Sequence, residues 1–200
     1  MGVAWVFEHT GSAREIERLL EGGGAEPIGT YSVDFLPYSP TGAVGVGIQT
    51  NYVLHHSNFP QTSFSIAPSD SLKSSPRATC DRGFDLILTK MSAGLQPDHA
   101  GKFTLTGYQY RLCDFVIRVG TASQVTAVKG AIVEVEYEPS QVATQAINML
   151  SEFMTNYFPL YADEAKKPDV LNRKSPEPYT ALETMWQYLN IFRQMRSRSS

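Results

Sequence analysis

The chain has 200 residues, of which 42% are hydrophobic and 18% are charged, and its formal net charge at pH 7 is -3. This composition is ordinary for a soluble globular protein, and it gives no electrostatic reason to expect DNA, RNA or an acidic membrane as the main partner. No apolar run is long enough to span a bilayer, and the two cysteines, Cys80 and Cys113, form no close pair. We expect a single soluble intracellular domain, residues 1–200, whose core forms without disulfides.

The N-terminal part predicts a strand from Val3 to Phe7, followed by a short helix over residues 13–21. Ser12 and Glu15 have the spacing of a capping box, in which the two residues satisfy each other's free backbone N–H groups. Three consecutive glycines, 22–24, then end the helix, because glycine readily takes the backbone conformation found after a last helical turn.

The middle of the chain alternates apolar and polar side chains, as half-buried strands do. Turn-rich stretches separate the alternating segments, and the one at residues 68–82 is rich in Ser and Pro, which favours a mobile loop. The predicted strands after the first helix are residues 27–38, 51–58, 62–67, 84–90, 107–120 and 128–139.

The stretch GYQYRLCDFVIRVG, residues 107–120, alternates in two phases that change at Leu112–Cys113. Because strand side chains point to opposite faces in turn, a slip of one residue moves the apolar set to the other face. A β-bulge shifts the register in this way and bends the strand, so we predict a bulge or barrel corner there, with Cys113 as a small buried thiol. The alternative is that two short strands meet at this point, which Asp114 makes possible, although no Gly or Pro marks a turn.

Two helices are predicted after the strands, at residues 141–158 with Ser140 as the N-cap and at residues 180–196. Thr180 and Glu183 form a second capping box, and the proline-rich stretch between the helices indicates a linker or covering loop. Strands followed by helices indicate an α+β fold with an antiparallel sheet. About eight strands within residues 3–138 exceed a comfortable flat sheet, so we expect a closed antiparallel β-barrel flanked by one N-terminal and two C-terminal helices.

Most candidate catalytic and metal sites have the wrong residues or spacing. The glycine-rich segment at residues 42–47 leads into a strand and lacks the Lys-Ser/Thr pair of a phosphate-binding loop. His55 and His56 are expected on opposite faces of a strand, where they cannot easily share a zinc ion. No Gly-x-Ser-x-Gly elbow is present for a Ser-His-Asp triad. The sequence therefore predicts no catalytic residue, no cofactor and no metal site.

The one arrangement suited to metal binding or catalysis is the period-two series of carboxylates at the end of the last predicted strand. Such carboxylates could hold a divalent ion inside a barrel, as in triphosphate-cleaving tunnel enzymes, so a metal-dependent phosphohydrolase that uses Glu134 and Glu136 is an alternative. No second carboxylate pair lies on another predicted strand, and we favour solvent-facing glutamates that pair loosely with nearby cations. The residues concerned are Glu134, Glu136 and Glu138 with Arg111, Arg118 and Lys129.

Several stretches of the chain resemble the Mediator subunit 20 family, whose members belong to the head module of the RNA polymerase II Mediator complex. The similar stretches are MGV, GTYSVDFLPY, YVLHHSNFP with SFSI, FDLILTK, YQYRLCDFVIRVGT with KGAIVEVEY, and YTALETMWQYLNIFRQMR. The resemblance implies a helix-flanked antiparallel barrel in the nucleus, without catalytic activity. It also implies a heterodimer with Mediator subunit 18, attachment through the C-terminal segment of subunit 8, contact with other head-module subunits, and indirect action on RNA polymerase II.

The first hypothesis for function is therefore a structural and interaction subunit that acts through surface complementarity. Candidate contact surfaces are exposed strand edges, the loop aromatics Tyr38, Tyr52 and Phe59, and apolar residues left over on the two C-terminal helices. The sequence leaves the residues that contact partners unknown. A third hypothesis is nucleic-acid binding through the arginines of residues 193–200, for which a solvated, frayed terminus is the simpler interpretation.

Overall fold

The computed structural model describes residues 1–41, 49–90, 94–172 and 176–198, which form a nine-stranded antiparallel sheet with four α-helices. The strands are β1 Val3–His9, β2 Glu26–Pro40, β3 Asn51–His56, β4 Thr62–Ile66, β5 Arg77–Asp81, β6 Leu95–Pro97, β7 Phe103–Leu112, β8 Phe115–Gln124 and β9 Ala127–Tyr137. The helices are α1 Ala13–Gly22, α2 Gly83–Lys90, α3 Ala143–Tyr157 and α4 Ala181–Ser197. None of these helices is long and apolar enough to cross a membrane.

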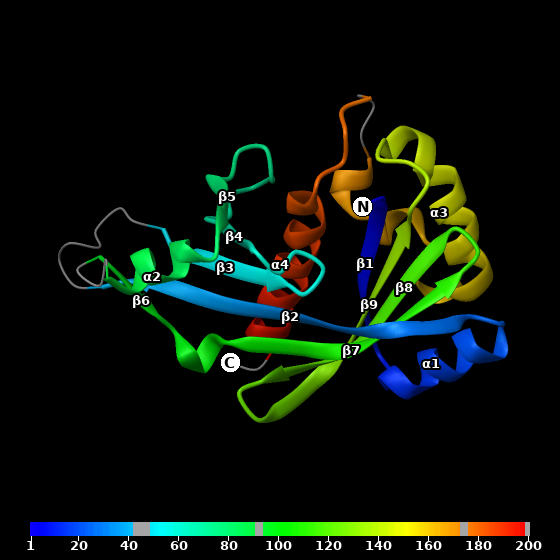
Figure 1. The fold of residues 1–200 in the computed structure, drawn as a ribbon, viewed down its shortest axis with the longest axis horizontal. Coiled ribbons are helices and arrows are strands. Elements are labelled where there is room, and N and C mark those ends of the chain that lie inside the picture. Colours follow the sequence, from blue (N-terminus) through cyan, green and yellow to red (C-terminus); the bar gives the residue numbers. More distant parts are fainter. Residues whose placement is uncertain (42–48, 91–93, 173–175, 199–200) are drawn as a thin grey trace.

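The sheet follows the order β1-β9-β8-β7-β2-β3-β4-β5, and the short strand β6 pairs with β2. Within the described ranges β5 does not pair with β1, so the closed barrel of about eight strands is not found there. The α+β class and the antiparallel pairing are confirmed. Helix α4 contacts β1 on one side and β3 and β4 on the other, and Figure 1 shows it between these two ends of the sheet.

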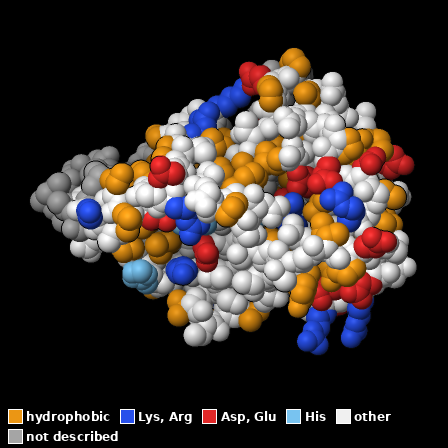
Figure 2. Space-filling model, viewed as in Figure 1, with side chains coloured by type: hydrophobic (Ala, Val, Ile, Leu, Met, Phe, Trp, Pro, Cys, Tyr) orange, Lys and Arg blue, Asp and Glu red, His pale blue; other side chains and the backbone are white. Residues whose placement is uncertain are grey.

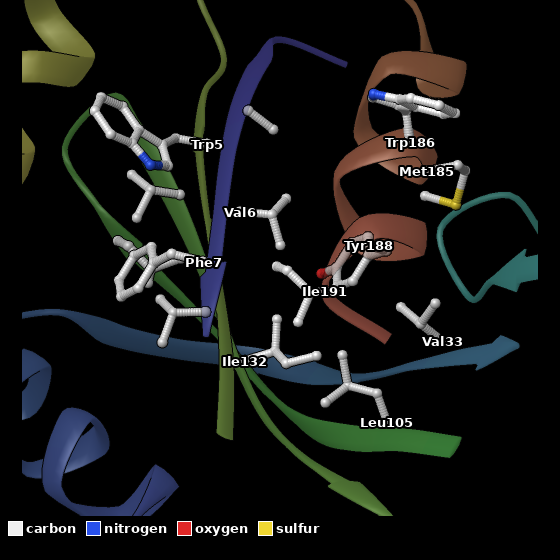
Figure 3. Close-up of a cluster of buried hydrophobic side chains, with 14 of the residues drawn as sticks. Trp5, Val6, Phe7, Val33, Leu105, Ile132, Met185, Trp186, Tyr188 and Ile191 are labelled. Carbon is white, nitrogen blue, oxygen red and sulfur yellow. The ribbon is translucent and has the colours of Figure 1, made fainter. Parts of the chain in front are cut away.

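Helix α4 is buried around most of its circumference because it fills the space that the sheet encloses. Tyr188, Leu189 and Phe192 are fully buried, and the ring centroid of Phe192 lies 5.1 Å from that of Phe35. Figure 3 shows Val6 of β1 on the side of α4, beside Tyr188. The last helix therefore belongs to the core of this chain.

The other face of the sheet is covered by α1 and α3. Trp5 and Phe7 point to this face in Figure 3, away from α4. The ring of Phe115 on β8 stacks on that of Phe153 on α3 with 4.2 Å between centroids, and α1 packs against β8. The strands β1, β8 and β9 are thus buried on both faces, like the central layer of a three-layer arrangement.

The predicted helix positions agree with the structure to within two residues, and both capping boxes are present, Ser12 with Glu15 and Thr180 with Glu183. The predicted N-cap of α3 is wrong, because Val142 holds that position. Ser140 acts earlier, where its Oγ accepts a hydrogen bond of 3.1 Å from the backbone N–H of Val142.

The predicted bulge at Leu112–Cys113 is wrong, and the alternative of two strands that meet there is confirmed, since the chain reverses in a hairpin. Leu112 pairs directly with Phe115, and Cys113 has a positive φ of 51° in the two-residue turn between them. The alternation changes phase because paired residues on the two strands share a face, not because one strand swaps faces. Cys113 is consequently exposed, and the register shifts of the sheet lie at Pro27/Gly29 and Ala122/Ser123 instead.

Two other strand and loop assignments change in the structure. Residues 84–90 belong to helix α2, whose Leu88 packs with Tyr38 and Val53 while Leu86 points to solvent. The stretch 68–82, predicted to be a loop, contains the edge strand β5, which pairs with β4. A short apolar run fits a strand or one helical face equally well, so its period alone does not decide between them.

Candidate functional site: a buried ionic cluster beneath the last helix

The two glutamates singled out in the sequence lie under α4, beside an arginine of the neighbouring strand. Glu134 and Glu136 on β9 are 3% and 4% exposed, and Arg118, which pairs with Glu134 across β8 and β9, is 4% exposed. The prediction that these carboxylates face solvent is therefore wrong. It holds only for Glu138, which is exposed and pairs with Arg111 at 2.5 Å.

We define the ionic cluster as Arg118, Glu134, Glu136, Tyr188 and His56, and hydrogen bonds join the first four of these residues. Arg118 Nη1 donates to Glu134 Oε1 at 2.6 Å and to Glu136 Oε2 at 2.7 Å. The Tyr188 hydroxyl of α4 donates to Glu134 Oε2 at 2.6 Å. Both oxygens of Glu134 are thus engaged, one by the sheet and one by the helix.

His56 completes the cluster from β3. Its Nδ1 accepts a hydrogen bond of 3.1 Å from the backbone N–H of Asn58, which places the proton of the neutral ring on Nε2. Nε2 lies 3.4 Å from Glu134 Oε2 without a hydrogen bond between the two atoms, so the contact is electrostatic. His55 contacts Asp85 and Ser63 on the other face of the strand, as the sequence predicted for neighbouring histidines.

The electrostatics of the cluster keep Glu134 ionised. Burial alone would raise the pKa of its carboxyl, but the positive charge of Arg118, the contact with His56 and the hydrogen bond from Tyr188 together lower that pKa to about 2. Burial, and then the charge of Glu134, hold the pKa of Tyr188 well above its ordinary value. The tyrosine therefore stays a hydrogen-bond donor, and the cluster joins β8, β9 and α4.

A small pocket of about 200 Å³ opens beside the cluster and is lined by His56, Arg118, Glu134 and Glu136, among others. A divalent ion would need carboxylate oxygens that are free to coordinate it. Here Arg118 already takes one oxygen from each glutamate, and Gly2 donates its backbone N–H to the remaining oxygen of Glu136. In the part of the chain that the structure describes, no three His, Cys, Asp or Glu side chains are grouped to hold a metal.

The remaining sequence candidates are mostly engaged within the chain. Tyr38 is buried, and Tyr52 and Phe59 pack partly against the core, so none of the three is a free surface aromatic. The segment 42–47 lies outside the described residues.

The arginines of residues 193–198 lie on α4 or directly after it, which differs from the expected frayed tail, while residues 199–200 lie outside the described residues. Arg196 pairs with Asp98 at 2.6 Å, and Arg198 pairs with Glu8 at 2.8 Å. Figure 2 shows Lys and Arg side chains in several separate places on one face, with Asp and Glu among them. A continuous positive surface for nucleic acid is not seen on that face.

Comparison with known proteins assigns the family. The family model described as "TATA-binding related factor (TRF) of subunit 20 of Mediator complex" matches residues 1–193. The chain belongs to the Mediator subunit 20 family. A Mediator subunit 20 relative from Caenorhabditis briggsae is 45% identical over 201 residues, with 100% of both chains covered. The mouse relative is 31% identical over 187 residues, covering 92% of this chain and 85% of its own.

Solved structures add a likeness of fold alone. The PH1012 protein from Pyrococcus horikoshii matches with a TM-score of 0.51 at 13% identity, covering 91% of this chain and 99% of that one. A conserved hypothetical protein from Pyrococcus furiosus matches with a TM-score of 0.50 at 13% identity, covering 92% and 99%. The Mediator subunit 20 fold of this chain is thus shared with proteins of very different sequence.

Proposed function

We propose that the chain is a non-catalytic structural and interaction subunit of the Mediator head module that supports RNA polymerase II transcription in the nucleus. The observation that carries this proposal is the match to the Mediator subunit 20 family over residues 1–193. Full-length similarity to relatives named as subunit 20 of the Mediator of RNA polymerase II transcription supports it.

The interior of the fold supports the non-catalytic part of the proposal. An active site needs a space in which a substrate meets reactive groups. Helix α4 packs over Glu134 and Arg118, and these two side chains form an ion pair, so neither charge is free to act on a substrate in the small pocket beside them. The ionic cluster therefore has a structural role, in which its hydrogen bonds hold α4 against the sheet.

We further propose that the chain forms a heterodimer with Mediator subunit 18 and is attached to the head through the C-terminal segment of subunit 8, as the resemblance of the sequence implies. Co-expression with subunit 18 followed by size-exclusion chromatography tests this directly. A stable one-to-one complex is the expected result. Two separate peaks at micromolar concentration would contradict the proposed pairing.

A second candidate is the metal-dependent phosphohydrolase, which the pocket beside Glu134, Glu136 and Arg118 favours. Release of phosphate from triphosphate with magnesium or manganese tests it, with wild type compared against the Glu134→Ala/Glu136→Ala double variant. We expect no metal-dependent turnover in either protein. Turnover in wild type that disappears in the double variant would replace the proposal of a non-catalytic subunit.

A further inference from the structure

The free edge of β1 is partly closed by a side chain that imitates a neighbouring strand. Gln187 of α4 accepts a hydrogen bond of 2.8 Å from the backbone N–H of Val6 through its Oε1. Its Nε2 donates a hydrogen bond of 2.9 Å to the carbonyl oxygen of Ala4. Because backbone groups of alternate residues point to opposite sides of a strand, the even-numbered residues of β1 present their groups away from β9.

The next position along this edge is open. The backbone N–H of Thr10, two residues beyond Glu8, donates to the Tyr161 hydroxyl at 3.0 Å. Between the two capped positions lie the carbonyl oxygen of Val6 and the N–H of Glu8, and neither has a hydrogen-bond partner in the described part of the chain. One donor and one acceptor at this spacing match the amide groups of one residue of an added strand.

Val6 and Glu8 both line a groove of about 520 Å³ between β1, α4 and the segment 161–169. Asn190 of α4 lines the groove and makes no hydrogen bond within the described residues. Asn190 and Trp186 also line a second hollow of about 510 Å³, so the two hollows adjoin across these side chains.

We propose that this groove, which we call the β1 groove, binds an extended segment of a partner Mediator subunit by strand addition. One residue of the segment donates its N–H to Val6 and accepts a hydrogen bond from Glu8, as peptides do at open sheet edges. The side-chain amide of Gln187 already shows that an amide fits the adjacent position of the same edge. This inference rests on the proposed function, because it assigns the partner to the same complex.

The charges at the β1 groove are balanced within the chain. Lys166, Lys167 and Arg198 line it with Glu8 and Asp169, and Lys167 pairs with Glu164 at 3.0 Å, which adds a third carboxylate. The segment is therefore expected to bind through its backbone amide groups and uncharged side chains.

Hydrogen exchange of the Glu8 amide tests the strand addition. The measurement compares the isolated chain with the same chain in a Mediator head assembled from co-expressed subunits, by mass spectrometry with residue-level fragmentation. In the isolated chain this N–H has no acceptor among the described residues, so we expect it to exchange quickly. We expect at least tenfold slower exchange in the complex, with little change at the amide of Thr10. Unchanged exchange at Glu8 in an assembled complex would overturn the inference and leave the proposed function standing.

A pair of variants tests the same hydrogen bond. Glu8→Pro removes the N–H that faces the groove, and proline is tolerated on edge strands where that group is not needed by the sheet. Glu8→Ala keeps the N–H and loses the same ion pair with Arg198, so it is the matched control. We expect about tenfold weaker binding of the partner subunits by Glu8→Pro and less than threefold by Glu8→Ala, while both proteins unfold at similar temperatures.

Other outcomes count against the inference. Equal binding of partners by the two variants would show that the Glu8 N–H takes no part in assembly. Dimers of the isolated chain in analytical ultracentrifugation, with a protected Glu8 amide, would assign the β1 groove to a second copy instead. Failure of the chain to enter any Mediator complex would remove both this inference and the proposed function.

Discussion

Replacing Arg118 by methionine tests whether the ionic cluster fastens α4 to the sheet. The variant keeps a long apolar side chain of similar reach but leaves Glu134 and Glu136 buried without their cation. The pKa of Glu134 is about 2 in the folded chain against an ordinary value of 4.5. At 1.4 kcal/mol for each factor of ten, its ionised form contributes about 3 kcal/mol to the free energy of unfolding at pH 7. Removing one partner of a buried ion pair typically costs about 3–5 kcal/mol.

Urea unfolding at several pH values measures this loss. We expect Arg118→Met to lower the free energy of unfolding at pH 7 by about 3–5 kcal/mol. The folded-state pKa of Glu134 lies below its unfolded value, so this stabilisation is present above pH 4.5 and is lost as the pH falls toward 2. The difference between wild type and variant should therefore shrink in acid, because protonation removes the uncompensated charge.

Arg111→Met is the matched control for this experiment. Arg111 also pairs with a glutamate of β9, Glu138, but its side chain is 45% exposed and that of Glu138 is 41% exposed. Exposed pairs contribute about 0–1 kcal/mol, so this variant should unfold almost as wild type does. Equal losses for Arg111→Met and Arg118→Met, or a loss for Arg118→Met that does not change with pH, would refute the reasoning.

Three further substitutions test other parts of the packing by thermal and urea unfolding. Gln187→Leu removes the two hydrogen bonds to the edge of β1 and should cost about 2 kcal/mol, and an unchanged stability would show that the cap is unimportant. Phe192→Ala should cost about 3–5 kcal/mol, against less than about 0.5 kcal/mol for the exposed Leu86→Ala, and similar losses would contradict the central position of α4. Gly107→Ala would place a Cβ atom 1.9 Å from the carbonyl oxygen of Val119, so the strands must separate and the stability should fall by about 2 kcal/mol or more.

Features with local causes could be predicted from the sequence. The capping boxes at Ser12 and Thr180 depend on residues three positions apart, and both helices begin where those residues predict. The phase change at Leu112–Cys113 was a real signal, but a two-residue turn without Gly or Pro produces the same pattern as a bulge. The strand predicted for residues 84–90 was wrong for a similar reason, since seven apolar-rich residues are too few to distinguish a strand from a helix.

The ionic cluster and the β1 groove could not be predicted, because both depend on contacts between distant residues. Strand β9 alternates valine with glutamate, which is typical of a strand with one solvent-exposed face. Helix α4 covers that face from 54 positions further along the chain, where Tyr188 meets Glu134. Likewise, Gln187 reaches Val6 across 181 positions. The opposite charges of Arg118 and Glu134 at facing strand positions were the one available sign of pairing.

Native mass spectrometry of the chain co-expressed with Mediator subunit 18 tests the central claim most directly. The account predicts a one-to-one complex that contains the intact 22.1 kDa chain. A phosphate-release assay on the same sample is expected to show no hydrolysis of triphosphate when magnesium or manganese is added. A chain that remains alone at micromolar concentration and hydrolyses triphosphate with either metal would contradict it.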